Sequence, residues 1–298
     1  MGINIYQVDV FSSKPFGGNP AGVVPDARGL SEEDMQDIAR EMNLSETVFI
    51  VPKDKDNYEV RFFTPTNEVD LCGHGTIGAF YVLACKGYIP SLYSRVRRVY
   101  QNTKVGKLAV DISYCNGNVE KVMMEQAPPK DLGKVEYMEE LLECFNIERS
   151  NIGIGREYIE PRIVSTGLKD ILLPLNSKET LESLRVDFKK LEDISNKLKI
   201  IGVHAFYLPH INSDKVYTRN FAPAVGINEE SATGTANGGL IYFLKDRGYI
   251  HGNEILSIQG EQLNRKSLIY CRIHDKNGEY SVKVGGQAKI VLEGIIYC

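Results

Sequence analysis

The amino-acid sequence predicts an α+β protein with two pseudo-symmetric lobes, each a mainly antiparallel sheet wrapped around a central helix. Three observations lead to this fold class. Strand-like segments recur along the chain, helical patterns are few, and one unit of strand, turn and helix occurs twice. With 298 residues, of which 43% are hydrophobic, the chain has enough apolar material for a large core.

Most of the predicted elements are strands. Segments rich in Val, Ile, Tyr and Phe that alternate with polar residues predict strands at 3–11, 58–63, 107–114, 119–125, 216–221 and 267–273. Basic side chains alternate over 95–104, which favours a solvent-facing strand over a phosphate-binding track. Because the net charge is −4, we expect a small molecule as partner, and neither nucleic acid nor an anionic membrane.

Helical patterns lie between these strands. One helix is expected to open at Ser31, where Ser-Glu-Glu-Asp resembles a capping box. Two more are expected at 138–145 and 187–199. Strands therefore dominate the predicted α+β fold.

An internal repeat organises the chain. Residues 72–89 (CGHGTIGAFYVLACKGYI) match residues 233–250 (TGTANGGLIYFLKDRGYI) at seven of 18 positions, with a constant offset of 161. Upstream, Phe-Thr-Pro at 63–65 is echoed by Phe-Ala-Pro at 221–223, with an offset of 158. An offset longer than half the chain indicates duplication of a whole lobe, with the lobes related by a pseudo-two-fold axis.

The repeated helix is apolar around most of its circumference in both copies, which predicts that it is buried. Gly87 and Gly248 are expected to end the two helices. At the other end, the turns at 73–76 and 234–237 would leave unpaired backbone N–H groups suited to an anion. The alternative is that these glycines serve tight turns alone.

The pattern Gly-His-Gly-Thr-Ile-Gly at 73–78 matches the dinucleotide fingerprint G-x-G-x-x-G. We expect no dinucleotide there. Arg97 and Arg98 stand where an acidic residue should follow, and the next strands read as hairpins rather than a parallel crossover.

Several titratable residues lie close to the glycine turns. Singly, each is more often a solvated or capping residue, but together they are the groups that proton transfer needs: Glu46, Asp70, His74, Glu229 and Glu230.

The six cysteines lie far apart and form no CxxC or Cys/His cluster, so neither structural zinc nor a disulfide framework is expected. The N-terminal residues lack a signal peptide or myristoylation pattern, and the apolar runs are too short to span a bilayer, so a cytoplasmic location is the default expectation.

Four ordered motifs resemble those of the PhzF family of phenazine-biosynthesis isomerases. They are FGGNPAGVV from Phe16, SETVFI from Ser45, FFTPTNEVDLCGHGT from Phe62 and NFAPAVGINEESATGTA from Asn220. The match runs from about residue 6 to residue 250 and implies the diaminopimelate epimerase fold. The implied first lobe is 1–118 plus about 286–298, the second is 119–285, and the active-site cleft lies between them.

The resemblance implies an isomerase that moves a ring proton and a double bond in a dihydro-hydroxyanthranilate, without metal or coenzyme, and that forms a homodimer. It places the acid/base carboxylate at Glu46, whose pKa we expect desolvation to raise. His74 would orient substrate or relay a proton. Glu230, where family members usually have Asp, would assist, and Ser231 replaces the usual Pro, which leaves the substrate open.

The resemblance also implies four substrate-binding residues: Asn19, Gly73, Gly234 and Thr235. Related epimerases use two opposed cysteines, at the positions held here by Cys72 and Thr233. A Thr hydroxyl is too weak an acid for that role, so two-thiol racemisation is not expected, and Cys72 is interpreted as a packing residue.

Two alternatives stay open at this point. The chain could be a one-base epimerase or racemase of an amino-acid-like substrate, or a protein that binds a small carboxylate without turnover.

Overall fold

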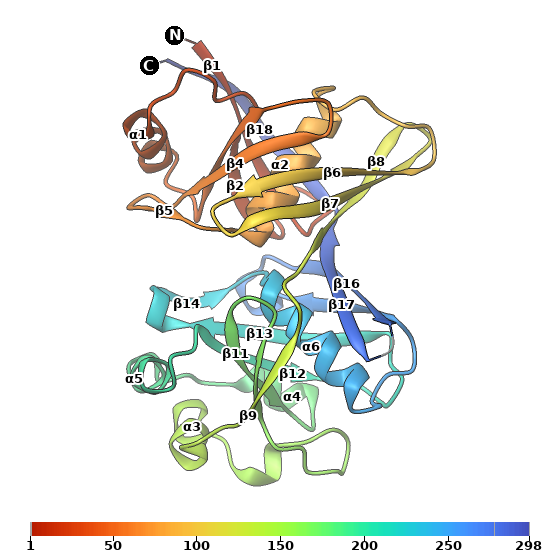
Figure 1. Ribbon diagram of the computed structural model, residues 1–298. Coiled ribbons are helices and arrows are strands. Elements are labelled where there is room, and N and C mark those ends of the chain that lie inside the picture. The colour runs from red at the N-terminus through yellow and green to blue at the C-terminus, as the bar shows by residue number, and fades with distance from the viewer. Residues whose placement is uncertain (1, 277, 298) are drawn as a thin grey trace. The chain divides into compact units, whose positions relative to one another are not determined.

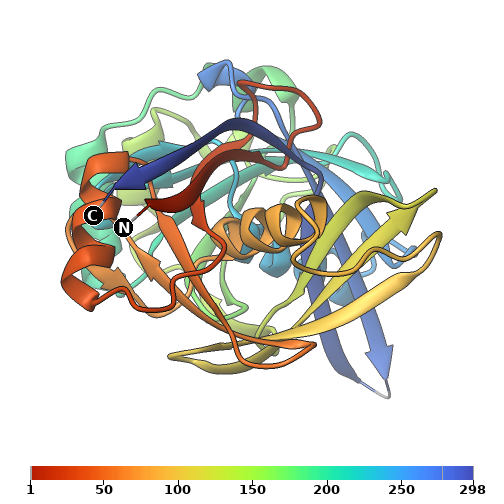
Figure 2. The ribbon, with the colours of Figure 1, turned by 90° about the horizontal axis from the view of Figure 1, so that it is seen from above.

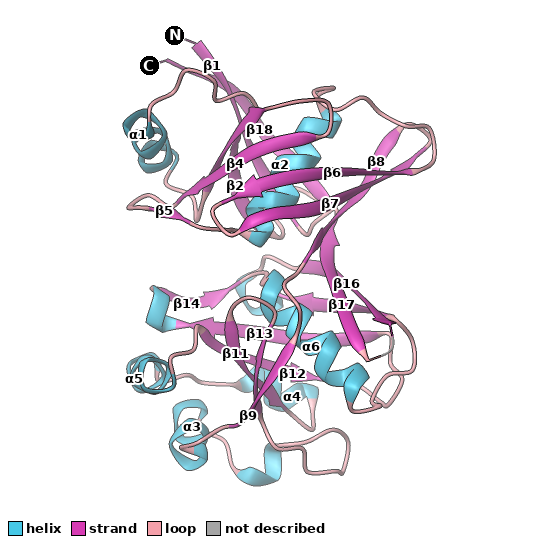
Figure 3. Ribbon diagram, in the orientation of Figure 1, coloured by secondary structure: helices cyan, strands magenta, loops and turns pink. Residues whose placement is uncertain are grey.

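The computed structural model describes residues 2–276 and 278–297 of the chain. These residues form two compact units, 1–125 with 285–298, and 126–284. Figure 3 shows that each unit consists mainly of strands with a few helices. The α+β class predicted from the sequence is therefore confirmed.

The first unit is a curved mixed sheet whose order is β18-β1-β2-β3-β4-β6-β7-β8. The short β5 pairs with the end of β4. Two pairings, β2 with β3 and β4 with β6, are parallel. Its elements are β1 (Gly2–Val10), β2 (Asn19–Val24), α1 (Glu32–Met42), β3 (Thr47–Pro52), β4 (Asn57–Phe63), β5 (Glu68–Val69), α2 (Gly73–Cys85), β6 (Val96–Thr103), β7 (Gly106–Cys115), β8 (Asn118–Glu125) and β18 (Ala288–Tyr297).

The second unit pairs its strands in the order β9-β10-β11-β12-β13-β15-β16, with the short β14 on the end of β13. Again two pairings, β11 with β12 and β13 with β15, are parallel. Its elements are β9 (Lys130–Lys134), α3 (Met138–Phe145), β10 (Arg162–Ser165), β11 (Lys169–Pro174), α4 (Lys178–Ser183), α5 (Phe188–Leu198), β12 (Gly202–Tyr207), β13 (Lys215–Ala222), β14 (Ile227–Glu230), α6 (Gly234–Asp246), β15 (Glu254–Gln259), β16 (Ser267–Lys276) and β17 (Glu279–Gly286).

The two units share one topology, which extends the sequence repeat well beyond its matching residues. Strands β1 to β4 pair in the same order and direction as β10 to β13, and α2 joins β4 to β6 as α6 joins β13 to β15. Both helices thus cross between parallel strands. The expectation of hairpins directly after the first glycine turn was wrong for β4 and β6 and holds from β6 to β8.

The repeated helices are the buried centres of the two units, as their all-round apolar surface predicts. Ten of the 13 residues of α2 and eight of the 13 of α6 are buried. Figure 2 shows α2 within the curve of the first sheet, with β1 and β18 on one side and β6 and β7 on the other. Both helices end as expected at left-handed glycines, Gly87 (φ 77°) and Gly248 (φ 75°).

The remaining helices pack on the outer faces of the sheets (Figure 1). Helix α1 buries Met35, Ile38 and Ala39 against Phe49 and Phe63. Its N-terminus is the predicted capping box, in which Ser31 and Asp34 bind each other's backbone N–H groups. The predicted helices at 138–145 and 187–199 are α3 and α5, which cover the second sheet. Among the described residues, no helix has the length and apolarity to cross a membrane.

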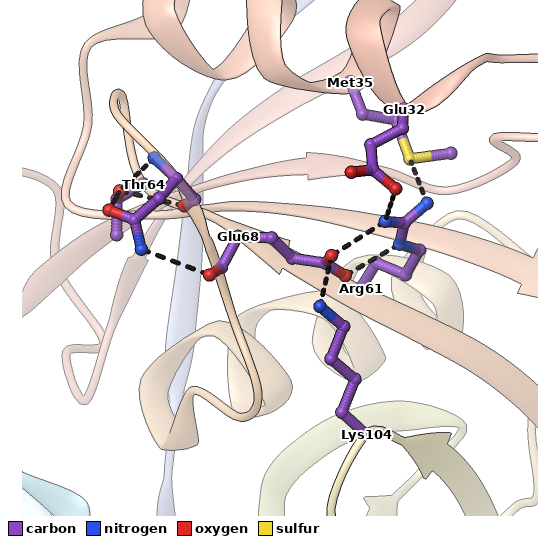
Figure 4. A network of polar contacts seen from close by, with 7 residues as sticks. Glu32, Met35, Arg61, Thr64, Glu68 and Lys104 are labelled. Carbon is purple, nitrogen blue, oxygen red and sulfur yellow. Dashed lines mark hydrogen bonds and ion pairs between the residues drawn. The ribbon is translucent and has the colours of Figure 1, made fainter.

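An ion-pair network fastens α1 to the sheet of the first unit (Figure 4). Arg61 of β4 donates two hydrogen bonds of 2.8 Å to Glu68 of β5 and one of 2.7 Å to Glu32 of α1. Lys104 adds a second cation beside Glu68. The Glu68 side chain is 10% exposed, so the pairing compensates the cost of burying its charge.

Gly78 of α2 is required by the packing of the helix on β1. A Cβ atom there would lie 2.8 Å from Val8 Cγ1 and 3.0 Å from Val10 Cγ2. We expect Gly78→Ala to lower the free energy of unfolding by about 1–2 kcal/mol, because overpacking outweighs the better helix propensity of alanine. Urea unfolding followed by circular dichroism measures it. Gly252→Ala is the control, since its Cβ would meet nothing closer than 4.0 Å, and equal stability of the two variants would contradict the prediction.

Candidate active site

Glu46 stands immediately before β3, where the backbone fixes its position. The N–H of Gly22 in β2 donates to the Glu46 carbonyl oxygen at 2.9 Å. Gly22 leaves room for this approach, because a Cβ atom there would lie 2.7 Å from Thr47 Oγ1. The Glu46 side chain is 16% exposed, so the carboxylate is largely removed from water.

His74 is the second residue of α2 and lies against Glu46. Its Nε2 is 2.9 Å from Glu46 Oε2, and its side chain is 6% exposed. On the other side of the ring, Nδ1 is 3.4 Å from Cys72 Sγ and 3.4 Å from Asn19 Nδ2. The structure therefore brings together three predicted site residues, Asn19, Glu46 and His74, from segments far apart in the sequence.

Cys72 does more than pack. It is the N-cap of α2, and its Sγ accepts a hydrogen bond of 3.3 Å from the N–H of Gly75. Burial raises the pKa of its thiol, and the neighbouring Glu46 charge raises it further. The sulfur thus stays a protonated thiol near neutrality.

Glu46 and His74 form a buried ion pair. Burial alone would lower the pKa of His74, but the neighbouring Cys72 sulfur and Glu46 carboxylate hold it well above its usual 6.5. Burial alone would raise the pKa of Glu46, yet the His74 charge and hydrogen bonds from His74 and Cys72 bring it below 4.5. The raised Glu46 pKa expected from the sequence is therefore wrong, because an imidazolium in contact outweighs desolvation.

The same three side chains include the donor atoms that a metal ion could use. Ligand atoms of Glu46, Cys72 and His74 lie within 4.8 Å of one another. The two ring nitrogens of His74, however, face different partners, with Nε2 toward Glu46 and Nδ1 toward Cys72 and Asn19. This geometry suits proton sharing along the chain of side chains better than ligation of one ion.

The glycines at the start of α2 divide into two kinds. Gly75 and Gly78 are packing residues, since a Cβ on Gly75 would lie 2.9 Å from Val48 Cγ2 and 3.2 Å from Phe62 Cδ1. Gly73 has no atom within 4 Å of such a Cβ, and Gly234 has none closer than 3.9 Å. The first residue of each central helix therefore faces open space, where its backbone is accessible to a ligand.

The second unit holds Glu230, Gly234 and Thr235. Glu230 ends β14, and the hydroxyl of Thr233 donates to its Oε2 at 2.6 Å. Thr235 follows Gly234 in the first turn of α6. Of the other acidic candidates, Asp70 is exposed and Glu229 is paired with Arg219 at 2.8 Å.

Two buried titratable residues of the second unit were not predicted from the sequence. Asp170 of β11 is 2% exposed, and burial together with the charge of Glu230 raises its pKa to about 7. His204 of β12 is fully buried, and burial lowers its pKa to about 4 despite hydrogen bonds with Asn220 and Asn237. An acidic residue in the apolar run Asp-Ile-Leu-Leu-Pro was the available signal for Asp170.

The repeat shows what the second unit has in place of the first unit's ionisable cluster. Thr47 pairs with Phe63 as Val203 pairs with Phe221, so Gly202 occupies the position of Glu46. At the helix start, Thr233 and Thr235 replace Cys72 and His74. The second unit thus lacks counterparts of all three ionisable residues.

Comparisons with known proteins agree over the whole chain. A family model described as phenazine biosynthesis-like protein matches residues 8–294. An uncharacterized isomerase of Clostridium acetobutylicum is 37% identical, with 97% of this chain and 96% of the relative covered. A trans-2,3-dihydro-3-hydroxyanthranilate isomerase of Pseudomonas chlororaphis is 32% identical, with 97% of each chain covered. A solved Bacillus anthracis protein of the PhzF family is 26% identical, with a TM-score of 0.87 over 100% of both chains.

The ion pair predicts an unusual titration of His74. In the wild type, the imidazolium should persist well above pH 6.5. In Glu46→Gln, the opposing charge is lost while burial remains, so we expect the pKa of His74 to fall below 6.5. Histidine-selective NMR across pH 4–10 measures both, with exposed His210 as an internal control. An unchanged His74 titration in the variant would show that Glu46 does not stabilise its charge.

The raised pKa of buried Asp170 is expected to make the free energy of unfolding depend on pH. Its folded pKa of about 7 lies above its ordinary value of 3.8, so the native state holds an extra proton between these pH values and loses stability as pH rises through them. Asp170→Asn should therefore match the wild type near pH 4 and exceed its free energy of unfolding at pH 8 by up to about 4 kcal/mol. Urea unfolding at both pH values measures this, and a variant that is no more stable at pH 8 would refute it.

Proposed function

The chain belongs to the PhzC/PhzF family of phenazine biosynthesis-like proteins, and from this membership we propose an isomerase that moves a proton and a double bond within a small carboxylate. The substrate class is a cyclic or unsaturated carboxylate similar to dihydro-hydroxyanthranilate, the compound in the name of the Pseudomonas chlororaphis relative. The observation that carries the proposal is the buried contact of 2.9 Å between Glu46 and His74.

Glu46 is the base in this proposal and His74 is its proton-holding partner. A carboxylate with a lowered pKa is ready to accept a proton at neutral pH, and partial burial strengthens its interaction with a substrate C–H group. The His74 imidazolium stabilises negative charge that develops on the substrate nearby. The Cys72 sulfur, 3.4 Å from Nδ1, can accept from the Nδ1–H of the imidazolium and so helps to hold the ring in place.

The isomerisation is balanced without any oxidant or reductant. Glu46 removes a proton from a carbon next to the double-bond system, and the C–H electron pair forms a new double bond. The electron pair of the old double bond then accepts a proton at its far carbon. The proton returns from Glu46, or the His74 imidazolium donates its own proton to that carbon and is reprotonated by Glu46 along their contact.

The difference between the two units supports one carboxylate base rather than a pair of opposed acids and bases. Gly202 stands in place of Glu46, and the two threonines at the start of α6 replace Cys72 and His74. Neither a glycine nor a threonine hydroxyl exchanges protons with a carbon acid near neutrality. The second unit therefore contributes to the proposed function through Glu230 and through binding groups.

Four groups would bind the substrate in this proposal. Backbone N–H groups at Gly73, Gly234 and Thr235 would hold the substrate carboxylate, and the Asn19 amide would contact it beside His74. The open space at Gly73 and at Gly234 supports this assignment, because it leaves the backbone of each glycine accessible to an anion. The proposed reaction uses no metal and no coenzyme, since proton transfer by side chains suffices for it.

Deuterium uptake tests the proposed function. Wild-type protein in heavy water should introduce deuterium at a substrate carbon when incubated with dihydro-hydroxyanthranilate or other cyclic, unsaturated carboxylates, as followed by proton NMR. Glu46→Gln should reduce the rate by about 100-fold or more, because the general base is lost. Glu68→Gln is the matched control, since the Glu68 side chain is 10% exposed against 16% for Glu46 but lies in the Arg61 network, and the rate of this variant should stay within a few fold of wild type.

The reaction product distinguishes the proposed isomerase from the two alternatives, a one-base epimerase and a carboxylate-binding protein. A shifted double bond supports the proposal, whereas inversion at a stereocentre without double-bond migration indicates a one-base epimerase. Saturable binding without exchange, unchanged in Glu46→Gln, would identify a carboxylate-binding protein and overturn the proposal.

A further inference from the structure

Gln259, the last residue of β15, is a fully buried amide that contacts both ends of the turn between β14 and α6. Its Nε2 lies 2.9 Å from the carbonyl oxygen of Glu230 and 3.1 Å from Thr233 Oγ1. Its Oε1 lies 3.2 Å from the N–H of Thr233 and 3.0 Å from Asn237 Nδ2. One side chain thus meets the backbone on both sides of the turn and the hydroxyl within it.

The orientation of this amide follows from its backbone partners. A backbone N–H can only donate and a carbonyl can only accept, so Oε1 must face Thr233 N and Nε2 must face Glu230 O. The Nε2 group therefore donates to Thr233 Oγ1. Because the hydroxyl oxygen accepts there, its own hydrogen must point elsewhere, and the Glu230 carboxyl oxygen at 2.6 Å lies ready to accept it.

The direction of the hydrogen bond from the Thr233 hydroxyl determines which oxygen of Glu230 can carry a proton. Since Oε2 accepts the Thr233 hydrogen, a proton carried by Glu230 is placed on Oε1. The bond also favours the ionised form of the Glu230 carboxyl, because the Thr233 hydroxyl donates to it.

We infer that Gln259 is a positioning residue, which acts through the Thr233 hydroxyl to fix one oxygen of Glu230 as an acceptor and leave proton transfer to the other. The inference rests on the proposed function for the assisting role of Glu230.

The Thr233 hydroxyl does not serve as an ordinary helix cap in this turn. Thr233 is the N-cap of α6, yet its hydroxyl accepts no bond from the first turn of that helix. A threonine in this place usually caps the helix. Here the hydroxyl serves Glu230, and Gln259 is itself held by Asn237, which also donates to the Thr233 carbonyl oxygen at 2.9 Å.

The test compares variants that remove the hydroxyl or its director without changing shape. Carboxyl ¹³C NMR of glutamate-labelled protein follows the titration midpoint of Glu230, with its signal assigned by its loss in Glu230→Gln. We expect Thr233→Val and Gln259→Leu each to raise this midpoint by about one pH unit, because the ionised form loses a hydrogen bond. Thr233→Ser keeps the hydroxyl and should titrate like the wild type. The double variant should shift no further than Thr233→Val.

Turnover gives the second readout. Thr233→Val and Gln259→Leu should lower kcat by about 10-fold or more through misplacement of Glu230, with recovery in Thr233→Ser. If Gln259→Leu does not fold, Thr233→Val carries the test with Thr233→Ser as its control, because Thr233→Val removes the hydroxyl through which Gln259 acts.

Unchanged midpoints in both Thr233→Val and Gln259→Leu would overturn the inference and leave the contacts a purely structural role. Because the titration needs no substrate, this outcome is separate from a failure of the proposed function, which deuterium uptake reports. Shifted midpoints in a protein without exchange activity would uphold the positioning of Glu230 and reject the isomerase.

Discussion

The burial of one helix within each curved sheet is the constraint on which the structure depends. Helices α2 and α6 are apolar around most of their circumference, so the sheet must curve around them to remove that surface from water. Glycines where the helices touch the sheet, such as Gly75 and Gly78, permit the close approach. Because the helices are held on several sides, their first residues are held too. His74 and Thr233 owe their fixed positions to this packing and not to the loops that precede them.

Most of this fold could be predicted from the sequence, because the same structural unit occurs twice along the chain. Alternating segments predicted β1, β4, β7, β8, β13 and β16 within a few residues, and the repeat at 72–89 and 233–250 predicted both buried helices. Parallel pairing of β4 with β6 was missed, because strand patterns carry no direction across a helix. In the site, motifs indicated Glu46 and His74, but the direction of the Glu46 pKa depends on a contact between residues 28 positions apart. Asp170 and Gln259 were missed because their partners come from other segments of the chain, Glu230 for Asp170 and the turn before α6 for Gln259.

The two halves have kept one topology and diverged in chemistry. The first unit places a carboxylate, an imidazole and a thiol in mutual contact. The second builds the equivalent region from threonine hydroxyls and amides, which hold their protons near neutrality and serve as hydrogen-bond directors. Two of its buried titratable groups, Asp170 and His204, are pushed toward their neutral forms by burial, which shifts their pKa values in opposite directions. The first unit therefore has a cluster of ionisable side chains in contact, and the second has hydroxyl and amide groups at the equivalent positions.

The pairing of β1 with β18 determines when the sheet of the first unit can be completed during translation. Among the described strands β1 is synthesised first and its neighbour β18 last, and the two pair from Gly2 with Tyr297 to Val10 with Ala288. Through most of translation, at roughly 5–20 residues per second, one edge of β1 has no native partner. The sheet around the Glu46 and His74 pair is therefore completed after the whole second unit has been synthesised. A nascent chain has every ionisable residue of that cluster long before it has the finished sheet that surrounds it.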